Sequence, residues 1–550
     1  MANIVVVGAG TMGAGIAAVA ALAGDSVSLI EPDAGAQSRA RDVILRQAQD
    51  DTGAQDDTIM QRVQFYDSVP TGLDAELAIE AVPERLDLKR TIFKTLADAL
   101  GPKALLATNT SSLSVSEIAE SVEHPERVLG LHFFNPPVVM KLVEIVRGDE
   151  TSDEAVAQAR AIAERFGKTA VVTADTPGFI VNRVARPFYL QAMHAYEEGV
   201  APMEDLDRLA RGAGFRMGPF ELMDLIGLDV NLATSQSIYE RTGAARLKPV
   251  ALQQELVAGG KLGRKTGSGF YDYSGGTPRH DDSPPQPPGE LNQDERILIV
   301  GITNVAIELR EALDKAYGHV NVCENAEAID EMPLDTTTVI DAGDGVSDRG
   351  AFIADLDRLF PPETVIFADA YATDLTSLAK RLRHPERVVG FGLLGSLERQ
   401  SVIEIVDAEN TSDDALELAQ EVFEAIGKRV VLVEDRPGLF LGRTIGSIIN
   451  EAVYAVQEEE VASPADVDLA MRLGTNYPLG PIAWGREIGG DRVVRILQRL
   501  AGAEGAAFSP HRALWVLDVQ DEDNAMDVAV AEGAVESKPG GSVIYPGMPF

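Results

Sequence analysis

The residues best suited to acid–base chemistry are a histidine and a glutamate on two successive strand-like runs. His132 comes near the end of an apolar run over residues 128–134, and Glu144 lies toward the end of the next run, residues 141–146. Histidine suits general-base catalysis because the pKa of its imidazole lies near neutral. If the two runs pair as adjacent strands, the carboxylate can orient the imidazole and stabilise its protonated form. Such a pair can accept the hydroxyl proton of a secondary alcohol while hydride leaves the same carbon.

A site for a hydride acceptor is indicated at the N-terminus. A continuous apolar run at residues 4–7 is followed by the turn Gly8-Ala-Gly-Thr-Met-Gly, an alanine-rich helix and a second run that ends in Glu31. In such a βαβ unit the three glycines allow a tight turn, close approach of a pyrophosphate and close packing of helix on strand. The helix N-terminus offers its free N–H groups to the phosphates.

The end of this unit favours NAD over NADP. The Glu31 carboxylate can accept a hydrogen bond from a ribose 2′-hydroxyl, and no arginine directly follows it to bind a 2′-phosphate. The residues predicted to bind the cofactor in this unit are Gly8, Gly10, Thr11, Met12, Gly13 and Glu31.

Composition indicates a globular protein of several domains. The chain has 550 residues, of which 45% are hydrophobic, and no apolar run approaches the roughly 18 residues of a membrane-spanning helix. A net charge of −38 argues against nucleic-acid binding, which needs a basic face. The single cysteine, Cys323, excludes an internal disulfide framework and a cysteine metal site, and no metal is expected. The absence of a basic stretch before the first apolar run argues against a signal peptide, and we expect a cytoplasmic protein.

An internal repeat organises the rest of the chain. The turn His124-Pro-Glu-Arg-Val-Leu-Gly recurs as His384-Pro-Glu-Arg-Val-Val-Gly, and Pro177-Gly-Phe recurs as Pro437-Gly-Leu. The offset is 260 residues there but 293 at the start of each copy, so the second copy has lost about thirty residues after its second strand.

The repeat predicts an α/β Rossmann-like dinucleotide-binding domain plus an all-helical C-terminal domain, both present twice, with the second copy degenerate and shortened. Strand–helix alternation fills the first part of each copy and gives way to long helical patterns near the two Pro-Gly sequences. Five prolines between residues 274 and 290 indicate an exposed linker. The predicted domains are residues 1–176 (NAD-binding), 177–273 (helical), 274–292 (linker), 293–436 (degenerate Rossmann-like) and 437–550 (helical with a C-terminal tail).

The first copy resembles the L-3-hydroxyacyl-CoA dehydrogenases over residues 1–273. The resemblance is carried by motifs in the family's order: Gly8-Ala-Gly-Thr-Met-Gly, Glu80-Ala-Val-Pro-Glu, Asn109-Thr-Ser-Ser-Leu, Gly130-Leu-His-Phe-Phe-Asn-Pro-Pro, Lys141-Leu-Val-Glu, Pro177-Gly-Phe-Ile-Val-Asn-Arg, Gly218-Pro-Phe-Glu-Leu and Arg264-Lys-Thr-Gly-Ser-Gly-Phe-Tyr. The tandem arrangement is similar to that of longer bacterial members that oxidise 3-hydroxybutyryl-CoA or 3-hydroxyadipyl-CoA, in fatty-acid β-oxidation and aromatic-acid catabolism.

The resemblance implies roles for individual residues. His132 would be the catalytic base and Glu144 its partner, while Ser111 and Asn182 would hold the 3-oxygen and the thioester carbonyl of the substrate. Glu84 and Lys89 match positions that contact the nicotinamide ribose. Single-copy members dimerise through their helical domains, so residues 437–500 are expected to supply that interface within the chain. A pseudo-dimeric monomer and a larger homo-oligomer both remain open.

The second copy is predicted to be catalytically silent. Its glycine turn reads Gly301-Ile-Thr-Asn-Val-Ala306, which puts a threonine side chain where a pyrophosphate must approach the backbone. His132, Ser111 and Asn182 are replaced by Gly392, Tyr371 and Gly442. Glu404 survives, and we expect it to have no side chain left to orient.

The sequence therefore predicts NAD-dependent oxidation of an L-3-hydroxyacyl-CoA to the 3-oxoacyl-CoA. Two alternatives stay open at this point. One is a dehydrogenase of the same fold that acts on a free 3-hydroxy acid or a sugar acid. The other is a nucleotide-binding sensor or scaffold, which would bind NAD without turnover.

Overall fold

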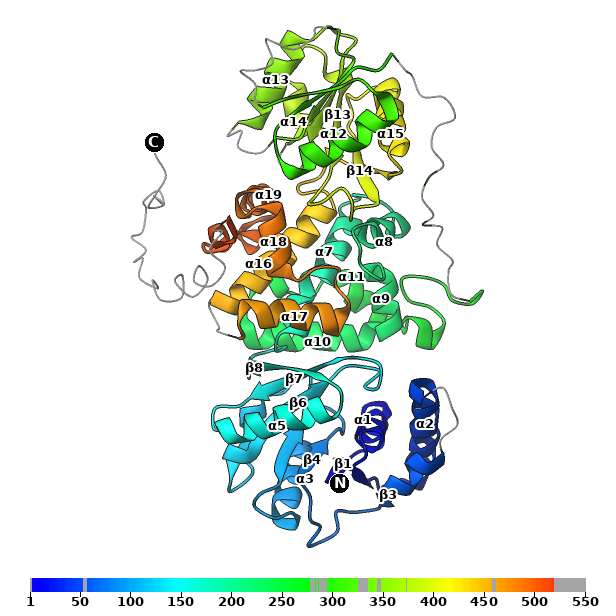
Figure 1. Cartoon of the computed structure of the whole chain (residues 1–550), viewed down its shortest axis with the longest axis vertical. Coiled ribbons are helices and arrows are strands. Elements are labelled where there is room, and N and C mark those ends of the chain that lie inside the picture. The colour runs from blue at the N-terminus through cyan, green and yellow to red at the C-terminus, as the bar shows by residue number, and fades with distance from the viewer. Residues whose placement is uncertain are drawn as a thin grey trace, which may run out of the picture.

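The computed structural model describes residues 2–52, 57–276, 282, 285, 294–324, 335–343, 348–371, 373–457 and 461–518. Two α/β domains lie at opposite ends of the molecule, and helices from both copies form one body between them (Figure 1). The predicted architecture, a Rossmann-like domain and a helical domain present twice, is confirmed. Most of the predicted linker and the tail after residue 518 lie outside the described residues.

The first sheet has eight strands in the order β3-β2-β1-β4-β5-β6-β7-β8. All neighbours pair in parallel except β6 and β7, which are antiparallel. The direction of winding reverses beside β1, so a ligand crevice is expected outside the carboxyl ends of β1 and β4. The strands are β1 (Asn3–Val7), β2 (Ser26–Ile30), β3 (Val63–Tyr66), β4 (Leu77–Glu80), β5 (Leu105–Thr108), β6 (Val128–Phe133), β7 (Leu142–Arg147) and β8 (Thr169–Ala174).

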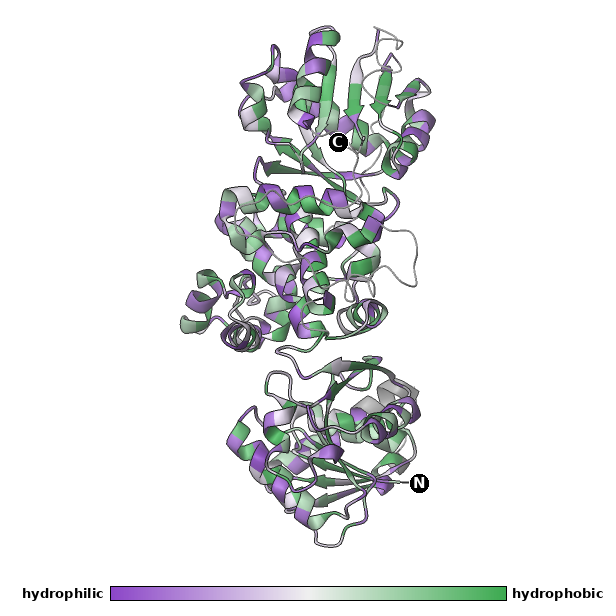
Figure 2. Cartoon of the chain, turned by 90° about the vertical axis from the view of Figure 1, so that its left-hand side faces the viewer, coloured by the Kyte–Doolittle hydropathy of each residue, from purple (hydrophilic) through white to green (hydrophobic). Residues whose placement is uncertain are grey.

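Helices cover both faces of this sheet, which is why its central strands β4 and β5 are apolar up to their last residues, Glu80 and Thr108. Figure 2 shows this contrast, with mostly hydrophobic strands inside and helices that carry polar residues on their outer sides. The helices are α1 (Thr11–Leu22), α2 (Ala34–Thr52), α3 (Leu86–Ala99), α4 (Val115–Ala119) and α5 (Asp153–Arg165), with 3₁₀ turns η1 (Asp57–Arg62) and η2 (Pro125–Arg127).

The second sheet repeats this topology with seven strands in the order β10-β9-β11-β12-β13-β14-β15, and its β13 and β14 are the antiparallel pair. Residues 324–337 join the strands that residues 31–76 join in the first copy, so the shortening removes the counterparts of α2 and β3 from the described part of this domain. The strands are β9 (Ile297–Val300), β10 (Val320–Cys323), β11 (Thr338–Asp341), β12 (Val365–Asp369), β13 (Val388–Gly392), β14 (Val402–Asp407) and β15 (Arg429–Glu434). The helices are α12 (Asn304–Tyr317), α13 (Arg349–Leu359), α14 (Leu375–Ala379) and α15 (Asp413–Ala425), with the 3₁₀ turn η6 (Pro385–Arg387).

The central helical body contains segments of both copies. The first copy contributes α6 (Val181–Val184), α7 (Arg186–Glu197), α8 (Met203–Gly212), α9 (Pro219–Ile226), α10 (Leu228–Thr242), α11 (Ala251–Ala258), η3 (Ala245–Leu247) and η4 (Arg264–Thr266). The second contributes α16 (Leu441–Gln457), α17 (Pro464–Thr475), α18 (Pro481–Ile488), α19 (Gly490–Glu504), η7 (Ala506–Phe508) and η8 (Leu514–Asp518). One buried apolar cluster joins them, including the rings of Phe188 and Phe215 against Tyr477 at 6.0 and 4.9 Å.

The two copies contact each other in a reciprocal manner. The Ala174 N–H donates to the Val461 carbonyl and the Glu434 N–H donates to the Val200 carbonyl, each at 2.9 Å. These four residues are two pairs related by the internal repeat. Each copy therefore presents the same patch to the other, as in the self-complementary interface of a two-fold dimer.

No helix in the described part of the chain is long and apolar enough to cross a membrane.

Candidate active site

His132 and Glu144 lie directly opposite each other on the antiparallel strands β6 and β7. The His132 Nδ1 and Glu144 Oε2 atoms are 2.6 Å apart, and the Glu144 side chain is fully buried. Its Oε1 atom accepts hydrogen bonds from the backbone N–H groups of Ile180 and Val181 at 3.1 and 3.0 Å. An ionised carboxylate only accepts hydrogen bonds, so Nδ1 carries a proton and the second ring nitrogen, Nε2, remains for a ligand.

The Pro-Gly-Phe turn before α6 delivers these two N–H groups. Gly178 and Phe179 both have positive φ, 81° and 50°, and the second value is strained for an aromatic residue. The Phe179 ring packs edge-on against the His132 imidazole at 5.7 Å, and Phe134 does so at 4.6 Å. The turn therefore fixes both the carboxylate and the plane of the imidazole.

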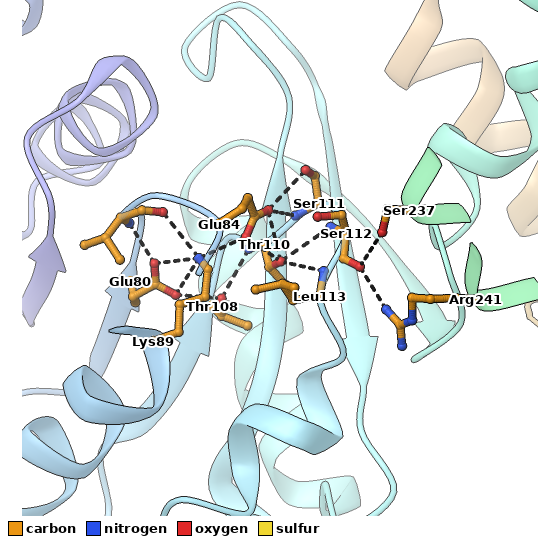
Figure 3. A network of polar contacts seen from close by, with 11 residues as sticks. Glu80, Glu84, Lys89, Thr108, Thr110, Ser111, Ser112, Leu113, Ser237 and Arg241 are labelled. Carbon is orange, nitrogen blue, oxygen red and sulfur yellow. Dashed lines mark hydrogen bonds and ion pairs between the residues drawn. The ribbon is translucent and has the colours of Figure 1, made fainter. Parts of the chain in front are cut away.

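A second group of polar side chains gathers on Glu84, as Figure 3 shows. The Ser111 backbone N–H and hydroxyl donate to Glu84 Oε1 at 2.7 and 3.2 Å, and Thr110 Oγ1 donates to both carboxylate oxygens. Lys89 Nζ lies 3.3 Å from Glu84. Three of the predicted site residues, Ser111, Glu84 and Lys89, are thus in one network.

Lys89 is buried between two carboxylates. Its ammonium is 1% exposed and donates to the two oxygens of Glu80 at 2.7 and 2.9 Å. Glu84, at 36% exposure, lies on the outer side of the lysine. Lys89 therefore holds the partly exposed Glu84 by an ion pair from the buried side.

Four residues of this region were given no role from the sequence. Glu80 and Thr108 end β4 and β5 and bind each other at 2.8 Å, while the Asn109 Oδ1 accepts the backbone N–H of Phe133 at 2.8 Å. Thr110 completes the Glu84 network. An acidic residue at the end of an otherwise apolar strand, as in Leu77–Glu80, is the signal that identifies Glu80, because a buried carboxylate requires a partner.

The helical domain reaches the same loop. Arg241 and Ser237 of α10 donate to the Ser112 carbonyl at 2.8 and 3.4 Å (Figure 3). Asn182 is half-buried at the start of α6, one residue after the Val181 N–H that binds Glu144. The candidate residues therefore come from the sheet and the helical domain together.

The glycine turn fits a dinucleotide. Gly8 has φ +101°, and a Cβ on Gly13 would lie 1.9 Å from the Gly8 carbonyl oxygen, so both positions need glycine. A Cβ on Gly10 would meet no heavy atom within 4 Å, and no side chain of the described residues caps α1 at this end. The open space and the free N–H groups suit a pyrophosphate. Thr11 is exposed and Met12 half-buried at the first turn of the same helix.

Glu31 is held at the end of β2 by backbone hydrogen bonds. Its two carboxylate oxygens accept the N–H groups of Ala9 and Asp33, each at 3.1 Å. This position beside the glycine turn is the one that a ribose-binding carboxylate needs. The residues present therefore fit NAD.

The second copy places a side chain at the equivalent helix N-terminus. The Thr303 hydroxyl accepts the Ala306 N–H at 3.1 Å and donates to the Ala342 carbonyl at 2.8 Å. The threonine thus occupies the helix N-terminus and consumes a donor that the first copy leaves free.

The expectation that Glu404 has nothing to orient is wrong. The Tyr371 hydroxyl donates to Glu404 Oε2 at 2.6 Å, and the carboxyl also accepts the N–H groups of Phe440 and Leu441. A Cβ on Gly392 or Gly442 would lie 2.9 or 2.6 Å from the Tyr371 side chain. One phenol ring therefore fills the space of the three side chains that the second copy has lost.

Burial raises the pKa of Glu404 to about 7, and burial together with the Glu404 carboxyl raises the pKa of the Tyr371 phenol well above its ordinary value. The pair therefore consists of a neutral donor and a weakly acidic carboxyl, and it has no nitrogen base. Both oxygens of the fully buried Glu404 already accept hydrogen bonds, from Tyr371 and from the N–H groups of Phe440 and Leu441, so neither oxygen is left to take a proton from an alcohol.

No cluster of three metal-ligating side chains occurs among the described residues. Cys323 is buried at the end of β10, and its burial raises the thiol pKa to about 11. A thiol of this kind is poorly reactive.

Comparison with known proteins gives a consistent result. The family model described as the 3-hydroxyacyl-CoA dehydrogenase NAD-binding domain matches residues 3–176 and 311–436. The model described as the C-terminal domain of the same enzymes matches residues 178–273 and 438–528.

Relatives resemble either the whole chain or its first half. The chain is 37% identical to a 3-hydroxyadipyl-CoA dehydrogenase of Escherichia coli over 506 residues, 90% of this chain and 93% of that protein. It is 40% identical to a probable 3-hydroxybutyryl-CoA dehydrogenase of Bacillus subtilis over 49% of this chain and 97% of that protein. Its fold is similar to the crystal structure of a 3-hydroxybutyryl-CoA dehydrogenase from Escherichia coli, with a TM-score of 0.75, 36% identity, and coverage of 93% and 97%.

Proposed function

The chain belongs to the 3-hydroxyacyl-CoA dehydrogenase family, and we propose that its first copy performs the NAD-dependent oxidation with His132 as the general base. The reaction of this family converts a 3-hydroxyacyl-CoA into the 3-oxoacyl-CoA. The observation that supports the assignment is the 2.6 Å contact between His132 and the buried Glu144, which leaves Nε2 of the imidazole for the substrate.

The chemistry that NAD supplies when bound is acceptance of the hydride from C3 of the substrate. In our proposal the glycine turn at Gly8, Gly10 and Gly13 and the N-terminus of α1 hold its pyrophosphate, while Glu31 binds a ribose hydroxyl. Glu84, supported by Lys89, is assigned to the nicotinamide ribose. The network that holds Glu84 keeps this carboxylate in one position before the cofactor arrives.

The proton step follows from the geometry of the imidazole. His132 Nε2 takes the hydroxyl proton, and the resulting imidazolium donates from Nδ1 to Glu144, which carries the compensating charge. Because Ile180 and Val181 already bind the other oxygen of this carboxylate, it needs no rearrangement during the reaction. Ser111 and Asn182 are assigned to the substrate's 3-oxygen and thioester carbonyl.

We assign the second copy a structural role. We propose that its helices take the place of the partner subunit to which single-copy members are expected to dimerise, so that the chain acts as a pseudo-dimer, with further assembly into a homo-oligomer as the alternative. The acyl-CoA thioester is the proposed partner. The net charge of −38 opposes binding to nucleic acid or to an anionic membrane surface, and we propose a cytoplasmic enzyme.

Turnover of L-3-hydroxybutyryl-CoA, followed by NADH absorbance, tests the assignment. His132→Gln should lower kcat by roughly 10²–10⁴, the usual scale of general-base catalysis. His124→Gln is the matched control, because the His124 side chain is exposed and its one polar contact within the described chain is with the neighbouring Glu126. Near-normal turnover of the His132 variant, with NAD binding retained, would rule the proposed base out.

A further inference from the structure

A buried arginine lies one helical turn beyond the proposed substrate-binding Asn182. Arg186 begins α7 and is 3% exposed. Its Nε donates to the Asn182 carbonyl at 2.6 Å, and its Nη1 lies 3.2 Å from Ser235 Oγ and 3.5 Å from the Asn231 carbonyl. The guanidinium also lies over the Tyr189 ring at 4.8 Å.

Within the described residues, this cation forms no ion pair with a carboxylate. Burial lowers the pKa of Arg186, and the phenols of Tyr189 and Tyr477 oppose this shift. A guanidinium nevertheless remains charged in proteins. Arg183, three residues earlier and equally buried, binds Glu451 at 2.7 Å. Buried charges are normally paired, so the absence of an anion beside Arg186 calls for one from outside the chain.

A second unused donor lies in the same cluster. Asn231 is 2% exposed, its Oδ1 accepts from Gln253 at 2.9 Å, and its Nδ2 has no hydrogen-bond partner among the described residues. A buried amide N–H without an acceptor is costly. A carboxylate has enough lone pairs to accept from both the guanidinium and this amide.

The internal repeat shows that this cluster is absent where the chemistry is absent. Arg186 corresponds to Gly446, and the α10 residues Asn231 and Ser235 correspond to Val493 and Leu497 of α19. A Cβ on Gly446 would lie 3.7 Å from Leu497, so apolar atoms fill the equivalent space.

Arg183, which pairs with a residue of the other copy, differs from Arg186 because the second copy keeps it. Arg183 is retained as Arg443, which binds Glu198 of the first copy and Glu504 of the second. The scaffold also tolerates the loss of Arg186, because α16 runs unbroken over Leu441–Gln457 where the first copy has α6 and α7. The polar cluster is therefore present in the copy that has the proposed catalytic side chains and absent from the copy that has the same fold without them.

We propose that Arg186, with Asn231, binds a carboxylate at the far end of the substrate's acyl group, so that the preferred substrate is the CoA thioester of a 3-hydroxy dicarboxylic acid. This inference rests on the proposed function, since it places the thioester and C3 beside Asn182 and His132. Residues 182 and 186 are four apart, a separation of about 6 Å along a helix. A six-carbon dicarboxylic acyl chain, which has three bonds between C3 and its terminal carboxyl carbon, matches that scale.

A matched pair of substrates tests the proposal in the full-length protein. L-3-hydroxyadipyl-CoA and L-3-hydroxyhexanoyl-CoA have the same number of acyl carbons and differ in a terminal carboxylate against a methyl group. The wild-type kcat/KM should favour the dicarboxylic substrate by roughly 10- to 100-fold, the value of a charge-assisted hydrogen bond in a desolvated site. Arg186→Met should reduce this ratio to near one by slowing only the dicarboxylic substrate, and Arg186→Lys should restore part of it.

Two further variants keep the result decisive. Asn231→Val introduces the residue of the second copy and should lower the same ratio even if Arg186→Met fails to fold. Arg241→Met removes the other cation near the Ser112 loop and should leave the ratio unchanged. Equal wild-type rates on both substrates, a proportional loss on both in Arg186→Met, or a collapse of the ratio in Arg241→Met alone would overturn the inference. Absence of turnover on either substrate would instead contradict the proposed function.

Discussion

The role of Tyr371 in the second copy leads to a prediction that depends on pH. Tyr371→Phe removes one hydroxyl that donates to the buried Glu404 at 2.6 Å and leaves the ring that fills the site. A hydrogen bond to an ionised group is worth about 1.5–3 kcal/mol, whereas one between neutral groups is worth about 0.5–1.5 kcal/mol. The cost of the variant should therefore grow as Glu404 ionises.

The raised pKa of Glu404 determines how the stability of the protein changes with pH. Burial raises the pKa of Glu404 from 4.5 to about 7, so the wild-type protein loses stability as the pH rises through this range and levels off above it. The Tyr371 hydrogen bond lowers that pKa, so its removal raises the pKa further and extends the loss of stability to higher pH. The difference between variant and wild type should be small near about pH 5.5 and full near about pH 8.5.

Thermal unfolding of the full-length protein at the two pH values measures this difference. At the higher pH the midpoint should fall by about 3–12 °C, since each kcal/mol corresponds to about 2–4 °C in a domain of this size. In a Glu404→Gln background the cost should no longer depend on pH, because the amide does not titrate. Turnover by the first copy at 25 °C should be unchanged, because Tyr371 lies in the other copy. An equal cost at both pH values would falsify the assigned pairing.

Three other changes test the remaining parts of the structure. Glu144→Gln should lower kcat by roughly 10²–10⁴ with little change in the KM for NAD, which steady-state kinetics with varied NAD would measure. Gly10→Val should raise the KM for NAD by roughly 10- to 100-fold, because the added side chain enters the open space beside the free N–H groups of α1, and unchanged NAD binding by calorimetry would contradict the assigned cradle. Gly212→Ala should cost about 1–3 kcal/mol in urea unfolding, because its Cβ would lie 2.3 Å from Val402, whereas Gly502→Ala, with no heavy atom within 4 Å, should be neutral or stabilising.

The cofactor unit was predictable because its requirements are local. The spacing of Gly8, Gly10 and Gly13 reflects contacts within one βαβ unit, and the following acidic residue ends the next strand. The pairing of His132 with Glu144 was also predictable, because successive strand-like runs of similar length tend to pair. The internal repeat made the second copy a control for each of these positions.

What the sequence did not reveal depends on contacts between distant segments. The filling of two vacated positions by Tyr371 could not be predicted, since residues 371, 392 and 442 meet only in the folded structure. The burial of Lys89 between two carboxylates was missed for the same reason, as was the break between α6 and α7 that places Arg186 beside α10. These features are visible only once side-chain burial is known.

The structure also gives a physical reason why a copy without catalytic side chains is kept in the chain. The second copy's α17 packs against both β7 and α6 of the first copy. β7 carries Glu144, and α6 contributes the Val181 N–H that binds it. A Cβ on Gly474 of α17 would lie 2.9 Å from Leu142 and 3.0 Å from Val181, so the contact allows little space between the two copies. The second copy thus supports, from behind, the two elements that fix the carboxylate of the proposed catalytic pair, and we expect its loss to loosen that pair.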